Sequence, residues 1–125
     1  MVVYDAMADA LTDDDVDRLF HALADATRRD ILSRTMRADQ SITALSRGYD
    51  MSFAAVQKHV TVLADAGLVS KERRGRERLV RAVPARVRRA RELLSRYESL
   101  WRERAAGIEA ILAADDSVRG TARST

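Results

Sequence analysis

The sequence contains no cysteine, which excludes disulfide bonds, thiol-based redox sensing and thiolate metal sites. Proline occurs once and aromatic residues are few, a composition that suits a mostly helical chain. No apolar run approaches the roughly 20 residues that a membrane-spanning helix needs. The N-terminal stretch also lacks the basic segment followed by an apolar one that marks a signal peptide. We therefore expect a cytoplasmic protein without a membrane anchor, and the length of 125 residues predicts a single domain.

Acidic and basic side chains are unevenly distributed along the chain. Residues 1–30 hold eight Asp and three Arg, a net charge of −5, although the whole chain carries +3. Residues 66–104 hold thirteen basic and five acidic side chains, a net charge of +8. A basic segment in a nearly balanced chain indicates an anionic partner for that segment. For the part after residue 84, a well-solvated helix face explains the charge equally well, and charge alone does not separate DNA, RNA and an acidic protein.

Four stretches combine an N-cap residue with apolar residues at helical spacing. Helices are predicted after Thr12, Asp25, Ser41 and Ser52, each of which favours a helix N-cap. The third helix, a short turn and the fourth helix have the spacing of a helix-turn-helix. The residues expected to face the core are Val16, Leu19, Phe20, Leu23, Ile31, Leu32, Met36, Ile42, Leu45, Phe53, Val56, Val60 and Leu63.

The fourth helix, residues 53–66, has an outward side with small and polar residues. No acidic residue occurs from position 52 to position 64, although an ordinary solvent face often carries Glu. A helix that enters the major groove of DNA needs small residues for close approach and polar groups for bases and phosphates. His59 lies between the core and the solvent side, so it either packs or donates to a phosphate. The predicted DNA-contacting residues of this segment are Ser52, Ala54, Gln57, Lys58, His59 and Thr61.

Two β-prone runs follow, on either side of Arg74 and Gly75, and a Gly in such a short loop is typical of a β-hairpin. A two-stranded hairpin is marginal alone, so it is expected to pack on the helices. Its basic tip suits contacts with the DNA backbone. Alternatively, the charges only protect the hairpin edges, and Glu72 and Glu77 permit local ion pairs. The predicted DNA-contacting residues of the hairpin are Arg73, Arg74, Arg76 and Arg78.

A long helix is predicted from Pro84 to about residue 114, because Pro suits a first helical turn and only Gly107 interrupts the pattern. Apolar residues recur at intervals of seven along it. A helix of about 40 Å is longer than a globule of this size covers, so the stripe is expected to contact a second copy of the chain. The predicted dimer-interface residues are Val16, Leu94, Tyr97, Trp101, Ala105, Ile108 and Leu112.

The segments LFHALADATRRDIL, ITALS, SFAAVQKHVTVLADAGLV and RRGRERLV resemble the ArsR-type family of bacterial winged helix-turn-helix repressors over about residues 16–83. The resemblance implies that helix 53–66 contacts DNA, that the hairpin is the wing and that the terminal helices form a homodimer. Gln57 stands where the family often has Ser, and Ala26 where it often has Pro, so the base preference does not carry over. Arg28 takes the place of a family Arg and is expected to make either a phosphate contact or a structural ion pair.

Metal-sensing members of this family carry ligands that the chain lacks. The stretch SITALSRG has none of the cysteines that the best-known site places there, and the long helix has no His for the second kind of site. His21 and Asp25 are four residues apart, but two ligands do not make a metal site. We therefore expect no metal and no cofactor, as in members without a recognisable metal site.

Together, the patterns predict a mainly helical winged helix-turn-helix protein with a β-hairpin wing, which forms a homodimer. Its DNA-binding and dimerisation domain is expected over residues 12–114, with flexible ends at 1–11 and 115–125. The expected function is sequence-specific binding of a double-stranded DNA operator, palindromic or pseudo-palindromic, by the homodimer, as a repressor. A dimeric protein-interaction module with an acidic partner is the alternative. No nucleophile–base pair, Gly-rich phosphate loop or convergent carboxylate pair indicates an enzyme, and no pattern identifies a small-molecule effector.

Overall fold

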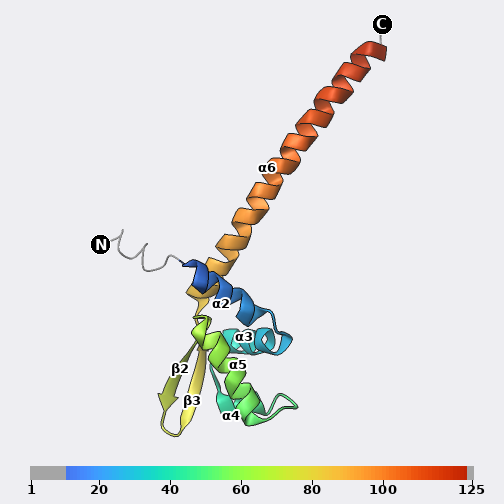
Figure 1. Ribbon diagram of the computed structural model, residues 1–125. Helices are drawn as coiled ribbons and strands as arrows, with labels where there is room; N and C mark the ends of the chain where they lie inside the picture. The colour runs from blue at the N-terminus through green and yellow to red at the C-terminus, as the bar shows by residue number, and fades with distance from the viewer. Residues whose placement is uncertain (1–10, 124–125) are drawn as a thin grey trace, which may run out of the picture. The chain divides into compact units, whose positions relative to one another are not determined.

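The computed structural model describes the backbone of residues 11–123 and the side chains of residues 11–116. Helices and one antiparallel hairpin follow one another as the sequence predicts, which confirms the predicted fold class (Figure 1). Of the predicted flexible N-terminus, residues 1–10 lie outside the described residues. The elements are α2 (Asp13–Leu23), α3 (Ala26–Arg37), β1 (Gln40–Ser41), α4 (Ile42–Ser46), α5 (Phe53–Asp65), β2 (Val69–Arg74), β3 (Glu77–Ala82) and α6 (Pro84–Arg123).

The helices begin where the sequence predicts, because each has a side chain that accepts a hydrogen bond from its first turn. Thr12 and Asp15 form a complete capping box at α2, with N···O distances of 3.0 and 3.1 Å. The backbone N–H of Thr12 is the main cause that holds the pKa of Asp15 below its ordinary value. Asp25, Ser41 and Ser52 cap α3, α4 and α5 in the same way.

The core lies between α2, α3, α4, α5 and the sheet. Most predicted core residues are buried, including Leu19, Ile31, Leu45, Leu63 and Val60. Burial of these side chains is the main source of stability, at roughly 1.5–3 kcal/mol for each fully buried aliphatic side chain.

Three predicted core residues are instead exposed: Phe20 by 37%, Met36 by 47% and Phe53 by 49%. On α3, Thr35 is buried in place of Met36, and its hydroxyl donates to the carbonyls of Ile31 and Leu32. A threonine that satisfies its hydroxyl within the helix is compatible with a core position. The hydrophobic period therefore identified the correct helices but not the exact width of their buried faces.

Two glycines with positive φ angles lie before the hairpin and in its turn. Gly67 has a φ of 76°, and the bonds from Gly67 N to Ala64 O and from Leu68 N to Leu63 O form the double-bonded C-terminal motif of α5. Gly75 has a φ of 61° at the first position of the two-residue turn between β2 and β3. Because L residues with side chains rarely adopt such angles, these two glycines set where α5 ends and where the hairpin turns.

The sheet contains one strand that the sequence analysis did not predict. The short strand β1 pairs with β3, so the order is β1-β3-β2, and Gln40 lies opposite Val80. The hairpin is therefore supported on the β3 side by a third strand as well as by the helices. Two residues are too few to show a strand pattern in the sequence.

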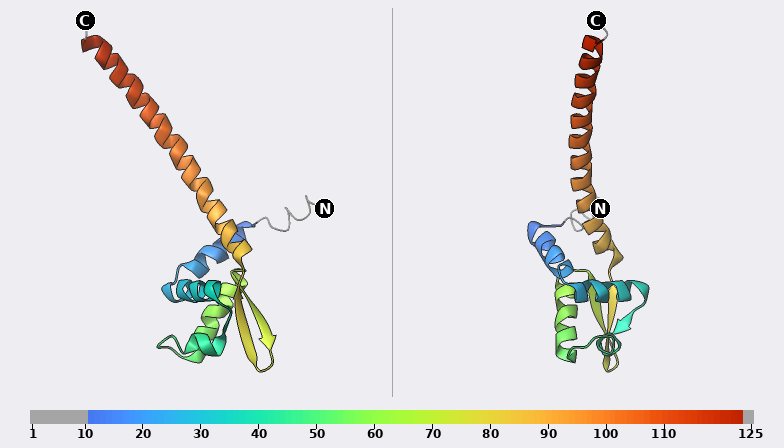
Figure 2. Two further views of the ribbon diagram at one scale, coloured as in Figure 1. Left: turned by 180° about the vertical axis from the view of Figure 1, so that it is seen from behind. Right: turned by 90° about the vertical axis from the view of Figure 1, so that its right-hand side faces the viewer.

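The chain divides into two compact units, one ending at Ala90 and the other beginning at Arg91. The first unit holds α2 to β3 and the start of α6, where Val87 packs on the core and Ala90 is buried in it. In this unit, the N-terminal end of α5 and the turn of the hairpin lie at the same end in all views (Figures 1 and 2). The second unit is the remainder of α6.

Helix α6 continues past the end predicted for it at residue 114 and reaches Arg123, so residues 115–123 are helical where a tail was expected. Ala113 and Ala114 are strong helix formers, and no proline follows to stop the helix. The small, polar composition of this segment was a weaker signal than the absence of a helix breaker.

Candidate nucleic-acid interface

On helix α5, Ala54, Lys58 and Thr61 lie on the side opposite the buried Val56 and Val60, whereas Gln57 and His59 lie at the edges of that side. Ser52, Ala54 and Lys58 are exposed, whereas Gln57, His59 and Thr61 are half-buried. The Ser52 hydroxyl oxygen accepts from Ala55 N at 3.1 Å, so this residue positions the start of the helix as well as lying on its surface. From Ser52 to Ala64 the outward side therefore offers an ammonium, an amide and a small side chain without any carboxylate, and the exposed Asp65 follows on the same side at the C-terminal end of the helix.

Thr61 joins α5 to the hairpin. Its hydroxyl donates to the carbonyl of Gln57 at 3.0 Å and accepts from Lys71 Nζ at 3.3 Å. Lys71 was not predicted as a site residue, although the alternation along β2 places it on the same side as the buried Val69. The ammonium group of Lys71 thereby extends the positive charge of the α5 surface to the hairpin.

The four arginines of the hairpin lie on different sides of it. In an antiparallel pair, directly opposite residues share a face and alternate residues change face. Arg73 lies opposite Arg78, on the side of Lys71 and the buried Val80. This side of the hairpin carries three cations, and neither Arg73 nor Arg78 forms an ion pair with a described residue.

On the other side of the hairpin, acidic side chains lie close to the arginines and offset their positive charge. Arg74 lies opposite Glu77, and Glu72 is on the same side. Arg81 bridges Asp39, at 3.0 Å, and Glu72, at 3.8 Å. Arg76, in the turn, belongs to neither strand. Of the predicted arginines, Arg73 and Arg78 thus form one cationic surface with Lys71, whereas Arg74 lies among carboxylates.

His59 turns its Nδ1 atom toward the interior of the helical unit. This atom lies 3.4 Å from Arg28 Nη1 and 3.9 Å from Asp25 Oδ2. Because arginine only donates, the contact requires His59 Nδ1 to accept. Of the two roles left open for His59, the geometry favours packing with one satisfied nitrogen.

Arg28 has a structural role, since it bonds the last carbonyls of α2. Its Nε donates to Ala22 O and its Nη2 to His21 O, each at 2.8 Å. Its backbone N–H donates to Asp25 and is the main cause that lowers the pKa of that carboxyl. These hydrogen bonds fix the connection between α2 and α3, and α5 packs against both of these helices.

The turn between α4 and α5 is also anchored to α3. The Tyr49 hydroxyl donates to Asp30 at 2.5 Å, and the Arg34 guanidinium lies 4.7 Å from the centre of the Tyr49 ring. Burial, followed by the bond to Asp30, raises the pKa of Tyr49 to about 12. A Cβ at Gly48 would meet only the guanidinium of Arg34, the movable end of a flexible side chain, and Gly48 does not have a left-handed backbone. The sequence analysis missed these positioning residues because the contacts join distant segments.

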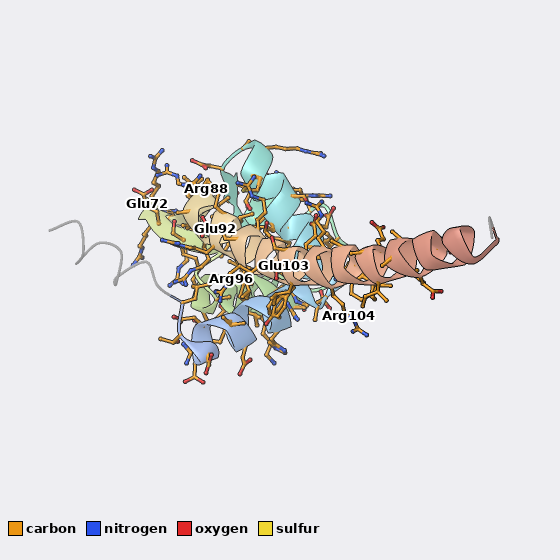
Figure 3. All side chains as sticks on the ribbon, turned by 90° about the horizontal axis from the view of Figure 1, so that it is seen from above. Glu72, Arg88, Glu92, Arg96, Glu103 and Arg104 are labelled. Carbon is orange, nitrogen blue, oxygen red and sulfur yellow. The ribbon has the colours of Figure 1, made fainter. Side chains whose placement is uncertain are left out.

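The second unit exposes the predicted dimer stripe. Leu94, Tyr97, Trp101, Ile108 and Leu112 are 45–62% exposed, and Ala105 is half-buried. Arg104 lies over the Trp101 ring at 5.7 Å, and charged side chains such as Arg96 and Glu103 stand along the same helix (Figure 3). On α2, Val16 is half-buried. Exposure of so many large apolar side chains marks a surface that usually contacts a partner.

Among the described residues, no group of three or more His, Asp or Glu side chains has the geometry to hold a metal ion. Within the same part of the chain, no helix combines the length and the apolar character required to cross a membrane.

A helix-turn-helix of α4 and α5, followed by the β2–β3 wing, defines the winged helix-turn-helix class of proteins. A search of protein-family models finds no match. The chain is 38% identical to the uncharacterized HTH-type transcriptional regulator YuzN of Bacillus subtilis, over 51% of this chain and 77% of that protein. It is 35% identical to the HTH-type transcriptional regulator Rv2034 of Mycobacterium tuberculosis, over 65% and 76% of the two chains.

Solved structures agree. An ArsR-like transcriptional regulator from Rhodococcus sp. RHA1 superposes with a TM-score of 0.73 at 35% identity, over 80% of this chain and 92% of that chain. The homodimeric winged helix-turn-helix DNA-binding domain Mb0332 of Mycobacterium bovis shares the fold, with a TM-score of 0.57 at 23% identity over 72% and 89%. The chain therefore belongs to the ArsR family of helix-turn-helix transcriptional regulators.

Proposed function

We propose that this regulator represses transcription by binding a palindromic, double-stranded DNA operator as a homodimer. The observation that carries the proposal is one continuous cationic surface. It begins on the outward side of α5, which carries no carboxylate from Ser52 to Ala64, and continues through the Lys71–Thr61 hydrogen bond to Arg73 and Arg78 on the wing. Phosphates attract such a surface, and the lack of carboxylates from Ser52 to Ala64 removes the repulsion that they would add there.

Helix α5 supplies the contacts with bases. Gln57 is the main candidate, because an amide bonds both N6 and N7 of adenine in the major groove. Ala54 permits close approach, and Lys58 reaches bases or phosphates from the adjacent part of the surface. Ser52, His59 and Thr61 position the helix, since their polar atoms are engaged within the protein.

The wing supplies the contacts with the backbone. Lys71, Arg73 and Arg78 face the same side as α5, so they reach phosphates that flank the groove in which α5 lies. Arg76 is exposed in the turn and is a further candidate, and Arg74 contributes less because Glu77 lies opposite it. With these assignments, most of the contacts between the wing and the DNA backbone come from one side of the hairpin.

The apolar stripe on α6 supplies the dimer contact. Leu94, Tyr97 and Trp101 recur at coiled-coil spacing and remain 54–62% exposed in the single chain. A homodimer places two copies of α5 on half-sites about one helical turn apart, which multiplies the selectivity of each. We propose residues 12–114 as the unit for DNA binding and dimerisation, acting in the cytoplasm as a regulator and not as an enzyme.

Selection of bound sequences from a random DNA pool, followed by footprinting, tests the proposal. We expect a palindromic sequence, and protection of two half-sites about 10 base pairs apart. The variant Gln57→Ala should change the selected base at one position per half-site while leaving most of the affinity. Binding without any selected sequence would contradict the proposal and favour an acidic protein as the partner of the basic surface.

A further inference from the structure

An aromatic side chain at the start of α5 is exposed to solvent. Phe53 is the first residue of this helix and is 49% exposed, although it lies only about 60° around the helix from the fully buried Val56. Tyr49 and Met51 of the same segment pack on the core, whereas Phe53 is not part of it. The fold has therefore left Phe53 unused for core packing.

The position of Phe53 decides what it can contact. In helix-turn-helix proteins, the N-terminal residues of the second helix approach the edges of the bases. Phe53 is four residues before Gln57, so the two side chains are neighbours on the helix surface. Phe53 begins α5, and the N-terminal end of α5 lies at the same end of the first unit as the turn of the wing (Figures 1 and 2). If this end of α5 enters the groove, a phenyl ring there would enter it together with Gln57.

Only one apolar group is available on the base edges of the major groove, the 5-methyl group of thymine. A phenyl ring has no hydrogen-bond donor or acceptor for the remaining base atoms. We propose that Phe53 selects thymine in each half-site by contact with this methyl group, beside the base that Gln57 bonds. This inference rests on the proposed function and adds a specificity residue to it.

Other exposed apolar side chains of the first unit do not have this position. Met36 is exposed to a similar extent, 47%, but belongs to α3. The variant Met36→Ala is therefore a matched control, because it removes an exposed apolar side chain away from the helix that enters the groove.

The contact is tested by removing the methyl group from the DNA. In the operator selected from the random pool, each thymine is replaced in turn by deoxyuridine, which keeps every hydrogen-bonding group. We expect a loss of about fourfold in affinity at one thymine per half-site, the factor that corresponds to one buried carbon-sized apolar group. Replacement in both half-sites should cost about 15-fold in the dimer.

The protein variants connect this loss to Phe53. Phe53→Ala should bind the thymine and deoxyuridine operators equally, Phe53→Leu should keep part of the difference, and Met36→Ala should keep all of it. Thermal melting of each variant confirms that it is folded. Two results would overturn the inference while leaving operator binding intact. In the first, no deoxyuridine replacement lowers the affinity of the wild-type protein. In the second, Phe53→Ala loses as much affinity on deoxyuridine replacement as the wild type does. Failure to select any sequence would overturn the proposed function, and this inference with it.

Discussion

The two sides of the wing differ in charge, and neighbouring arginines test this difference. Arg73 and Arg74 have the same side chain and adjacent positions on β2, but they point to opposite sides of the hairpin. Arg73 faces the side of Lys71 and Arg78, whereas Arg74 lies opposite Glu77. We expect Arg73→Ala to weaken all DNA binding and to reduce its salt dependence, and Arg74→Ala to do so by less than half as much.

The magnitude follows from counterion release. Each neutralised phosphate contributes about 0.9 to the slope of log K against log salt. Loss of one contact per wing in a dimer therefore flattens the slope by about 2 units for Arg73→Ala. The double variant Arg73→Ala/Arg78→Ala should flatten it by about 4 units. Between roughly 50 and 200 mM salt, this change corresponds to about 200-fold less variation in affinity.

Stability separates a structural from a functional role of these residues. Arg73 and Arg78 face each other directly, and like charges in such a pair destabilise a sheet by a few tenths of a kcal/mol. Their replacement should leave the melting temperature unchanged or slightly raised. The assay is fluorescence anisotropy with an operator duplex and with unrelated DNA, over a salt series. Equal slopes for Arg73→Ala and Arg74→Ala would refute the division of the wing into two sides.

Further predictions concern the dimer and the fold. Trp101→Asp should give monomers with weak operator binding, because Trp101 is 62% exposed in the single chain; Glu103→Ala should remain dimeric, and sedimentation distinguishes the two results. Gly67→Ala should lower the free energy of unfolding by about 1–2 kcal/mol, measured by urea denaturation, because its φ of 76° disfavours a Cβ. Asp15→Asn should flatten stability against pH in acid: the lowered pKa of Asp15 stabilises the fold above the unfolded value, and this contribution disappears as pH falls through the folded value. Unchanged acid sensitivity in Asp15→Asn would contradict the role of the capping box.

Features that depend on residues close in sequence were predictable. The N-caps at Thr12, Asp25, Ser41 and Ser52 each bond an N–H three residues away, so a short segment contains both partners. The hairpin turn depends on Gly75 in the same way, since its conformation is local. The winged helix-turn-helix class followed from the order of these elements.

Features that depend on packing between distant segments were not predictable. Phe53 carries the same apolar signal as the buried Val56, and only the assembled helices show that the core does not reach it. The strand β1 is too short for a pattern and exists because β3 has a free edge beside it. His59 lies near Arg28 only because α5 packs on the corner between α2 and α3.

The sequence by itself determined where the helices, the turn and the basic segments lie, because capping, backbone conformation and charge are properties of single residues and their near neighbours. The tertiary structure decided which of those charges act together. Strand register put Arg73 and Arg78 on one side and Arg74 beside Glu77, and the packing of α5 against β2 brought Lys71 to Thr61. Such pairings depend on the core between the elements, since side chains meet across a fold only after the backbone that carries them has been placed.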